Sequence, residues 1–568
     1  MMGTIYNQAD RVVVWLGKDE RGDGPGIARM ITHLADAWNQ YPMKDNWAKL
    51  PNFRTVDDLD NTDLLFEYGL PIWGTRGWIA LGLFLNREWF HRLWCAQEIA
   101  LARKPDDTRL QYGRTCVVWN DLISVSIFMS ITGLCKVVQE LLQNRVQDVS
   151  IQPGMIGEEA SSLFLIASFL KPDVPPEWVT LLMTQLEQAP ENLNGYNFLL
   201  LLLRILRKRE ASDERDKLLR LLGMVNHFCE VRGIEQVTVS PDYNRPPLLV
   251  LKDAAKDILM NTHGGLTFLS LGRSWSPMVD RPSWMIGFAG VEAAGRPLTE
   301  YLYYNVTPTY TTKEGVIRFR DDALQLSAHE VGTVEEVSLT GAEMASGKFS
   351  EYLHLVRKLP LPTRTGQPPT EVLWRVLIGD HDSYNKSADR ASDSISEDFS
   401  RFIQYMLLRE KLADIARQIP EMHYEVKLHL LDDLASNDKS GSICTSHQIK
   451  DLIKHHDIGI ENVSDSERRI LAIIPQNDRF IRDVQEMTSC RCLYRTVEGD
   501  LGLGPLSMRP GDRVWILRGA RVPFVLRPAT DVDKAHYHLL GETYVHGVMR
   551  GELLAQDSSL QWKDIGIV

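Results

Sequence analysis

The stretch Val12-Val13-Val14-Trp15-Leu16-Gly17 decides the fold class of the N-terminal region. A continuous apolar run ended by glycine is typical of a strand buried on both faces, as in a parallel sheet covered by helices. A loop rich in Gly, Pro and Asp follows at 22–26, and residues 27–38 have a helical pattern. The order strand, loop, helix predicts an α/β unit. The loop matches neither glycine-rich phosphate-binding motif, so we interpret it as an ordinary connection.

Residues 86–103 form the most informative segment, which we predict to be one helix. At 3.6 residues per turn, one stripe of this helix carries Phe90, Leu93, Trp94, Gln97 and Leu101. Gln97 lies near the centre of the stripe and Glu98 on its flank. An unpaired buried amide costs about 1–3 kcal/mol, so we expect Gln97 to hydrogen-bond to neighbouring backbone.

The middle of the chain is predominantly helical, and one charged segment within it has a capping pattern. Ser212-Asp213-Glu214-Arg215-Asp216-Lys217 precedes a leucine-rich run that reaches Gly223. We predict that Ser212 or Asp213 caps a helix and that Gly223 ends it.

The C-terminal part has the pattern of short strands. A hairpin is expected at 316–328 with its turn at Asp321-Asp322, and four further strands at 492–496, 513–517, 522–526 and 537–544. Glycine and proline punctuate them. This pattern predicts a small antiparallel barrel or sandwich, completed by the 316–328 hairpin.

Composition excludes several protein classes. The 568 residues are 44% hydrophobic and 24% charged, and 63 basic against 75 acidic residues give a net charge of −12, which argues against nucleic acid as a partner. Seven dispersed cysteines and the lack of a signal sequence indicate the cytoplasm. The longest apolar block is far shorter than a membrane span. Neither His455-His456-Asp457 nor Cys490-Arg491-Cys492 supplies four spaced metal ligands, so no metal is expected.

Ordered landmarks along the chain resemble fungal heterokaryon incompatibility (HET) domain proteins. They include the strand ending Trp-Leu-Gly at 15–17, Trp-Phe with Gln-Glu at 89–98, the charged segment at 212–217, Pro241-Asp242-Tyr243, and the tail from 502 to 552. The residues that carry the family motifs are Trp15, Gly17, Trp89, Phe90, Gln97, Asp213, Arg215, Asp216 and Lys217. The family resemblance implies non-self recognition and programmed cell death signalling.

The HET domain is itself similar to TIR domains, whose Trp-Cys-x-x-Glu motif resembles Trp94-Cys95-Ala96-Gln97-Glu98. In TIR enzymes that cleave NAD, this glutamate engages the ribose. The resemblance therefore implies Glu98 as the catalytic residue, with Trp94 in the pocket wall. Arg92 either faces a nucleotide phosphate or is solvated or paired with Glu88. The alternative for Glu98 is an exposed helix carboxylate. NAD would be a substrate, and no cofactor is expected.

Pattern and resemblance together predict an α/β plus α plus β multidomain chain. Residues 1–120 would be the C-terminal half of a TIR-like doubly wound parallel sheet, because the family's first strands do not appear before Met2. We expect the chain to be N-terminally truncated. A helical region at 121–300 would follow, then a β-hairpin segment at 301–345, a helical region with flexible linkers at 346–470, and a β-rich domain at 471–568.

Two functional hypotheses follow from the resemblance. In the first, the protein is an interaction and signalling component of incompatibility, acting on an unidentified incompatibility partner or through self-association. In the second, it is a NAD glycohydrolase that uses Glu98. The first is favoured because it does not require the absent strands, and we expect this chain to be inactive as a NAD hydrolase.

Overall fold

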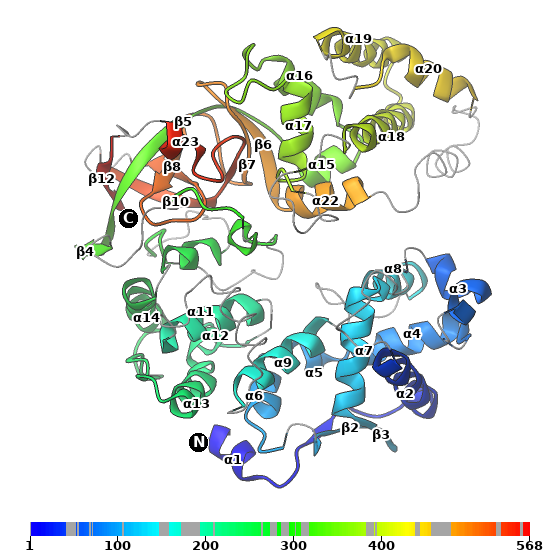
Figure 1. Ribbon diagram of the computed structural model, residues 1–568, viewed down its shortest axis with the longest axis vertical. Coiled ribbons are helices and arrows are strands. Elements are labelled where there is room, and N and C mark those ends of the chain that lie inside the picture. Colours follow the sequence, from blue (N-terminus) through cyan, green and yellow to red (C-terminus); the bar gives the residue numbers. More distant parts are fainter. Residues whose placement is uncertain are drawn as a thin grey trace. The chain divides into compact units, whose positions relative to one another are not determined.

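The computed structural model contains two compact units, residues 1–257 and 258–568. The helices and strands of both units are shown in Figure 1. The residues that the structure describes are 2–40, 53, 56–67, 70, 72–104, 107–146, 158–171, 194–207, 209, 211–262, 265–272, 281–285, 295–301, 303–307, 317–381, 391, 395–437, 443–455, 479–529, 535–556 and 561–568.

The first unit is mainly helical. Its helices are α1 (Met2–Gln8), α2 (Gly24–Gln40), η2 (Val56–Leu59), α3 (Thr62–Glu67), α4 (Gly74–Leu85), α5 (Glu88–His91), α6 (Trp94–Ala100), α7 (Trp119–Ile131), α8 (Leu134–Arg145), α9 (Glu158–Phe169), α11 (Gly195–Leu206), α12 (Asp216–Leu219) and α13 (Leu222–Arg232). Helix α14 (Pro247–Asn261) contains the boundary between the units. The core of the first unit is formed by fully buried side chains of α4, α6, α7, α8 and α11.

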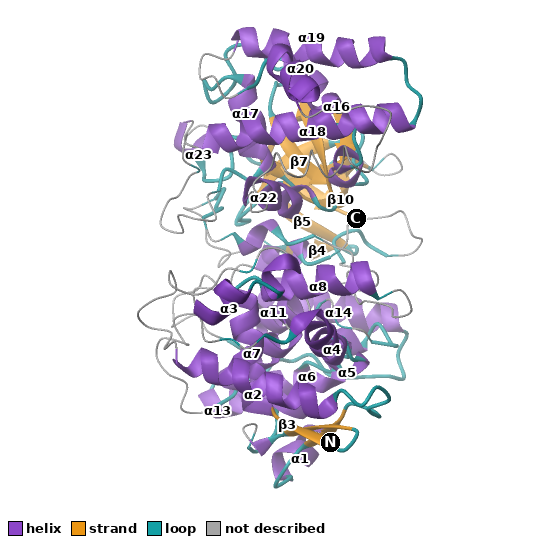
Figure 2. Ribbon diagram, turned by 90° about the vertical axis from the view of Figure 1, so that its right-hand side faces the viewer, coloured by secondary structure: helices purple, strands orange, loops and turns teal. Residues whose placement is uncertain are grey.

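A small sheet lies at the margin of this unit, with α2 and α7 on one side of it in both ribbon views (Figures 1 and 2). Its order is β1 (Val13–Trp15), β2 (Arg109–Tyr112), β3 (Thr115–Val118). β1 pairs with β2 in parallel, whereas β2 and β3 are antiparallel, so these three strands form a mixed sheet. The prediction that β1 is buried on both faces was wrong. Val14 is buried, but Val13 and Trp15 are 61% and 58% exposed, because the helices cover a single face.

Two other local predictions for this unit need correction. Residues 86–103 do not form one helix, because Arg92 takes an extended conformation and separates α5 from α6. Gly223 does not end a helix either. It lies in the first turn of α13, which ends instead at Gly233 in the left-handed conformation. Gly223 lies against the Gln97 side chain, where a Cβ atom would come 3.5 Å from Nε2.

The second unit combines helices with a large sheet, as the colours of Figure 2 show. Its helices are η5 (Gly265–Ser270), η7 (Leu298–Glu300), α15 (Gly341–Ala345), α16 (Ser350–Arg357), α17 (Pro369–Leu377), α18 (Ser396–Ala416), α19 (Glu421–Asn437), α20 (Ser446–His455), α22 (Arg479–Thr488) and α23 (Glu552–Gln556). Its strands are β4 (Arg318–Arg320), β5 (Ala323–Thr340), β6 (Arg491–Thr496), β7 (Leu501–Pro505), β8 (Arg513–Leu517), β9 (Phe524–Pro528), β10 (His536–Glu542), β11 (Tyr544–Val545) and β12 (Lys563–Ile567).

Five of these strands close into a barrel. The order is β5, β12, β10, β9 and β8, and β8 pairs again with β5. The predicted barrel is therefore confirmed, together with the hairpin that joins β4 to β5 through Asp321 and Asp322, both at positive φ. The barrel is not wholly antiparallel, since β10 and β12 run parallel.

The long strand β5 joins the barrel to a second layer. Its first half pairs with β12 and β8, and its second half pairs with β6, which continues to β7 and β11. Apolar side chains from both parts share one core: Val306, Val331, Val334, Cys492, Tyr494, Met508, Val514, Ile516, Val525, Leu540, Val545 and Val548.

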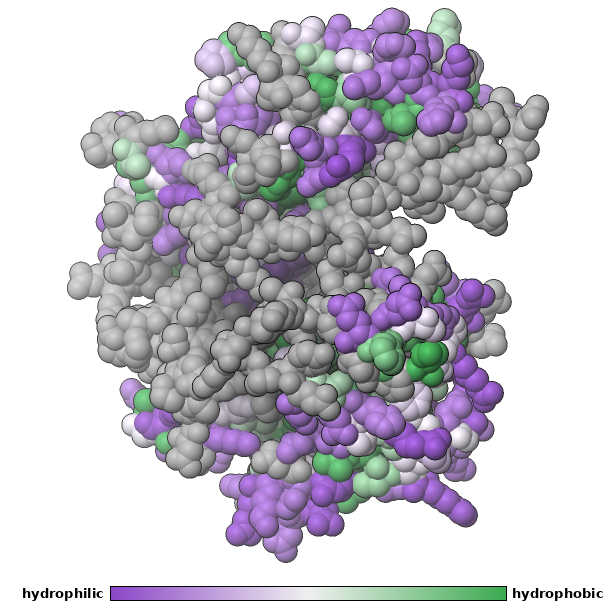
Figure 3. Space-filling view, turned by 45° about the vertical axis from the view of Figure 1, so that its right-hand side comes forward, coloured by the Kyte–Doolittle hydropathy of each residue, from purple (hydrophilic) through white to green (hydrophobic). Residues whose placement is uncertain are grey.

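Polar residues dominate the described surface seen in Figure 3, with hydrophobic residues in small separate groups. Among the described residues, no single helix has the length and apolar composition to cross a membrane. Helices α7 and α8, bent by 88° at their junction, reach that length and composition only as a pair.

Candidate functional site

Two of the motif segments meet in the first unit, although more than 100 residues separate them. The guanidinium carbon of Arg220 lies 3.1 Å from the centre of the Trp94 ring. The Gln97 side-chain amide donates a hydrogen bond to the Arg220 carbonyl. The backbone partner expected for Gln97 thus exists, but it comes from a distant segment. We call Trp94, Gln97, Asp216, Arg220 and Tyr243 the Trp94 cluster.

Asp216 is the buried acid of the Trp94 cluster, 3% exposed. Its carboxylate forms an ion pair with Arg220 and accepts a hydrogen bond from the Tyr243 hydroxyl at 2.6 Å. Burial and this bond to Asp216 raise the pKa of Tyr243 to about 12. The hydroxyl therefore remains a donor at neutral pH and keeps the buried carboxylate paired.

Hydrogen bonds between Asp213 and Arg215 stabilise the loop that precedes α12. The Asp213 carboxylate accepts the backbone N–H of Arg215 at 2.9 Å and its guanidinium at 2.7 Å. Arg215 also donates to the carbonyls of Tyr243 and Arg245, at 3.0 and 3.1 Å. The hydrogen bond from Arg215 lowers the pKa of Asp213. Neither Ser212 nor Asp213 caps α12, whose N-cap is Arg215, because Asp213 binds its own loop.

Lys217 is the fourth charged residue of the motif, and it points inward. It is 6% exposed, and its ammonium group donates to the carbonyl of Arg207 at 3.2 Å. A buried lysine needs such acceptors because desolvation otherwise disfavours its charged form. The charged side chains of the motif therefore stabilise the segment that contains them, through hydrogen bonds and an ion pair within it.

Glu98 lies in a half-buried corner beside the cluster. Its carboxylate accepts a hydrogen bond from the Trp89 indole N–H at 3.0 Å. Burial raises the pKa of the Tyr6 hydroxyl, and the neighbouring Glu98 adds to that rise. Glu98 is therefore not the fully exposed carboxylate of the alternative interpretation. Its catalytic role stays a prediction.

The residues around α5 have contrasting exposures. The Arg92 side chain is exposed at the break between α5 and α6. Phe90 is buried, packs edge-to-face on Trp89 and Phe84, and its carbonyl accepts a hydrogen bond from Arg209. Burial, with Arg209 nearby, lowers the pKa of His91 to about 4. His91 thus stays neutral between about pH 4 and pH 6.5, the range in which an ordinary histidine becomes charged.

Trp15 and Gly17 lie on and just beyond β1. Trp15 is exposed, and Gly17 has a φ of 98°, a left-handed conformation that favours glycine. The Gly17 carbonyl accepts a hydrogen bond from the Gly113 N–H at 2.9 Å, which joins the end of β1 to the turn after β2. The Trp15 side chain is therefore part of the solvent-exposed face of the small sheet.

Sequence reasoning did not single out Arg220. Arg220 had a usable signal, since it follows Asp216 by four residues, the spacing at which side chains meet on a helix. The contact between Gln97 and Arg220, 123 residues apart, has no local sequence signal.

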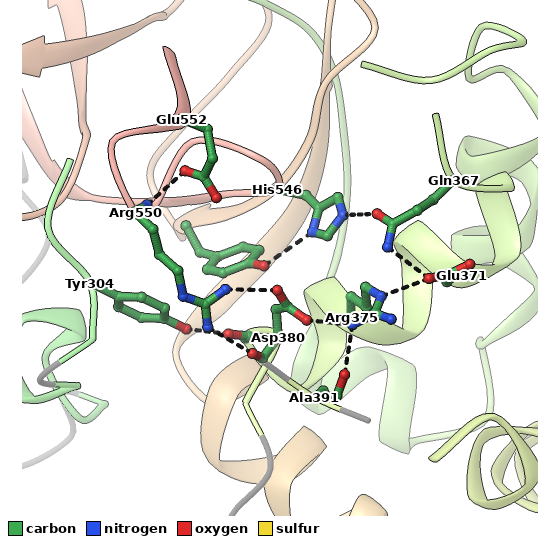
Figure 4. Close-up of polar contacts among 11 residues, drawn as sticks. Tyr304, Gln367, Glu371, Arg375, Asp380, Ala391, His546, Arg550 and Glu552 are labelled. Carbon is green, nitrogen blue, oxygen red and sulfur yellow. Dashed lines mark hydrogen bonds and ion pairs between the residues drawn. The ribbon is translucent and has the colours of Figure 1, made fainter. Parts of the chain in front are cut away.

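A buried ion network in the second unit was also missed (Figure 4). Asp380, 2% exposed, accepts hydrogen bonds from Arg375 at 2.7 Å and from Arg550 at 2.9 Å. Its φ of 49° places its backbone in the left-handed region. Asp380 thus ties the end of α17 to the segment that follows β11.

A chain of side-chain bonds extends this network to His546. Arg375 donates to Glu371 at 2.9 Å, and the Gln367 amide donates to the same Glu371 oxygen at 2.7 Å. The Gln367 oxygen then faces Nε2 of His546 at 2.6 Å, so this nitrogen is the donor. Figure 4 shows these side chains converging from α17, the segment before it and the segment that follows β11. In the described part of the chain, no group of three His, Cys, Asp or Glu side chains is placed to hold a metal ion.

Comparisons with known proteins match both ends of the chain. Residues 1–98 match the heterokaryon incompatibility protein (HET) family, and residues 467–561 match the Het-6 β-barrel domain. The chain is 22% identical to "Heterokaryon incompatibility protein 6, OR allele" of Neurospora crassa, over 97% of this chain and 78% of that protein. No solved structure matches the chain. The landmarks at 15–17 and 89–98, the five-stranded barrel and the match over 97% of the chain agree with one another. The chain is therefore similar to heterokaryon incompatibility (HET) proteins over most of its length, with a HET match at its N-terminus and a Het-6 β-barrel match near its C-terminus.

Proposed function

We propose that the protein acts in fungal heterokaryon incompatibility as an interaction and signalling component and not as an enzyme. The match to an incompatibility protein of Neurospora crassa over 97% of this chain supports the role in incompatibility. The non-enzymatic mechanism is supported by where the motif side chains lie.

The observation that carries this mechanism is that the motif residues bind one another. The Trp94 ring is stacked by Arg220, Gln97 is bound to the Arg220 carbonyl, and Glu98 accepts the Trp89 N–H. Groups engaged in this way hold α6 against the segment after α11. A pocket that takes a nucleotide would instead keep its polar groups convergent and open.

The test separates the charge of Glu98 from its packing. Glu98→Gln keeps an oxygen that accepts the Trp89 N–H but removes the carboxylate needed to stabilise an oxocarbenium-like transition state. Strains that express the wild type, Glu98→Gln or Arg220→Met would be fused with an incompatible strain, and death of fusion cells would be scored by dye uptake. Nicotinamide release from NAD would be followed with the purified proteins.

We expect killing by the wild type and by Glu98→Gln, and no nicotinamide release by either. Arg220→Met should reduce killing together with the amount of folded protein, because it leaves Asp216 buried without its cation. Nicotinamide release by the wild type, lost together with killing in Glu98→Gln, would overturn the non-enzymatic mechanism and leave the role in incompatibility standing.

A further inference from the structure

The second unit contains a small cavity where three helices come together. Its volume is about 290 Å³. Small-molecule sites have volumes of roughly 300–1,000 Å³, so this cavity has the size of a site for a small ligand. Its lining comes from Arg357 and the loop after α16, from the first turn of α17, and from the end of α19.

The first turn of α17 carries backbone donors without acceptors. The N-cap residue Pro368 offers no side-chain cap, and Pro369 has no N–H. The Val372 N–H donates to the Pro368 carbonyl at 3.0 Å. Within the described part of the chain, no hydrogen bond engages the N–H groups of Thr370 and Glu371. They lie at the positive end of the helix dipole, which favours an anion.

A buried hydroxyl at the same end of α17 also lacks a partner. Thr370 lines the cavity and is 2% exposed, and its Oγ1 atom forms no hydrogen bond with any described residue. A helical side chain leans toward the N-terminus of its helix, so this hydroxyl lies toward the end that borders the cavity. Most buried hydroxyls in proteins are paired. This hydroxyl is therefore a second, independent indication of a polar ligand group.

Arg357 and Asp433 add opposite charges to the lining. Their side chains form an ion pair at 3.2 Å and are 56% and 62% exposed. Such an exposed pair contributes little to stability, so a ligand can replace it. The Glu371 carboxylate does not line the cavity, and it accepts hydrogen bonds from Arg375 and Gln367. A purely anionic ligand would meet Asp433 as well as Arg357, whereas a ligand with both charges satisfies the two residues.

The remaining lining is apolar. Leu359 and Leu434 are buried at 6% and 5% exposure, and Leu361 is 65% exposed. An aliphatic group that covers these side chains removes apolar surface from water, which is favourable. A few polar groups beside an apolar wall are the usual composition of a small-molecule site.

We propose that this cavity binds a free aliphatic α-amino acid of the size of leucine. The carboxylate of the ligand accepts hydrogen bonds from the first turn of α17, from the Thr370 hydroxyl and from Arg357. Its ammonium group pairs with Asp433, and its side chain covers Leu361 and Leu434. The ligand thus replaces the ion pair between Arg357 and Asp433. This inference goes beyond the proposed function, because it concerns a different site in the other unit.

The test is isothermal titration calorimetry of the purified full chain with L-leucine up to about 10 mM, a range that includes millimolar affinities. Other probes each lack one feature of the ligand: isocaproate has no ammonium group, isoamylamine has no carboxylate, and inorganic phosphate has no aliphatic group. We expect saturable binding of L-leucine. Isocaproate and isoamylamine should bind at least about tenfold more weakly, because each leaves a charged group of the cavity without its partner. Phosphate should not bind.

Variants of the lining locate the binding. Thr370→Val removes the hydroxyl and keeps the branched shape, so affinity for L-leucine should fall about tenfold. Asp433→Asn removes the partner of the ammonium group, so the preference for L-leucine over isocaproate should disappear. Arg357→Met should weaken the binding of both ligands. Its matched control is Arg320→Met, at an 83% exposed arginine outside the cavity, which should bind like the wild type.

Circular dichroism confirms that each variant folds. Thr370→Val breaks no hydrogen bond between described residues, so it decides the question even if a charge variant fails to fold. The proposal is overturned by a wild type that does not bind L-leucine, by binding of phosphate alone, or by equal affinity for L-leucine in the wild type and Thr370→Val.

Discussion

The two sheets of this protein differ at their edges: one closes into a barrel, and the other ends at a strand that has no described neighbour on its outer side. In the second unit, β5 pairs with β12 on one side and with β8 on the other, so that five strands form a closed ring. In the first unit, β1 pairs with β2 alone and presents an open face and an open edge in the described structure. A closed barrel pairs its strands on both sides and buries its apolar side chains, whereas an open edge leaves backbone groups and apolar side chains exposed.

The sharpest contrast is between two tryptophans. Trp515 on β8 is 1% exposed and packs edge-to-face on Tyr537, whereas Trp15 on β1 is 58% exposed. Trp515→Ala should lower the free energy of unfolding by about 3–5 kcal/mol, because it leaves a large cavity in the core. Trp15→Ala should change it by less than about 0.5 kcal/mol. Urea denaturation of both variants measures this difference, and similar losses would remove the contrast.

The buried ion network predicts the next largest effect. Asp380→Asn keeps a residue that tolerates the left-handed backbone of this position but removes the charge between Arg375 and Arg550. We expect a loss of about 3 kcal/mol in unfolding free energy, because the buried carboxylate between Arg550 and Arg375 is lost, although Glu371 still pairs with Arg375. Denaturation midpoints within experimental error of the wild type would show that the network does not join α17 to the C-terminal segment.

His91 predicts a pH dependence in the first unit. Its pKa is lowered to about 4 in the folded chain from the ordinary 6.5, first by burial and then by Arg209. Between these values the unfolded chain binds a proton that the folded chain does not, so stability falls as the pH drops from 6.5 toward 4 and is unaffected above that window.

The loss at the lower end should be about 3 kcal/mol, since each unit of pKa difference corresponds to about 1.4 kcal/mol. Urea denaturation across this window compares the wild type with His91→Gln, which cannot titrate. The variant should show a smaller decrease in stability between pH 6.5 and pH 4. An identical pH dependence in both proteins would show that His91 is protonated equally in the folded and unfolded chains.

The smallest effect is expected at the end of β1. Asp10 and Arg103 form an ion pair at 3.7 Å with side chains 96% and 59% exposed. Asp10→Asn should cost less than about 0.5 kcal/mol of unfolding free energy, since water screens such pairs. Comparison with Asp380→Asn under the same conditions shows how strongly burial governs the effect of removing one carboxylate.

The sequence predicted the barrel better than the sheet of the first unit. β8 has the predicted bounds, 513–517, because an apolar run follows the turn-forming Pro510-Gly511-Asp512. β7 and β12 were missed because glycines interrupt their apolar patterns. The burial of β1 was mispredicted because an apolar run does not reveal whether a helix covers its second face.

The candidate site was predicted only in its local parts. The stripe on α6 correctly identified Gln97 as a buried amide that needs a backbone acceptor. The acceptor itself depends on tertiary packing. The capping prediction for Asp213 failed because a neighbouring Arg215 competes for the same carboxylate oxygens. Local patterns therefore identify which groups need partners, and the fold decides which partners they receive.

The most direct measurement of the contrast between the two sheets is amide hydrogen exchange of the full chain. The N–H groups of Val13 and Trp15 should exchange rapidly, because they point away from β2 and no described strand lies beside them. Amides that join β5 to β12 and β8 should exchange slowly, because both sides of β5 are paired. Protection of Val13 and Trp15 as strong as that of the barrel amides would contradict an open edge in the first unit.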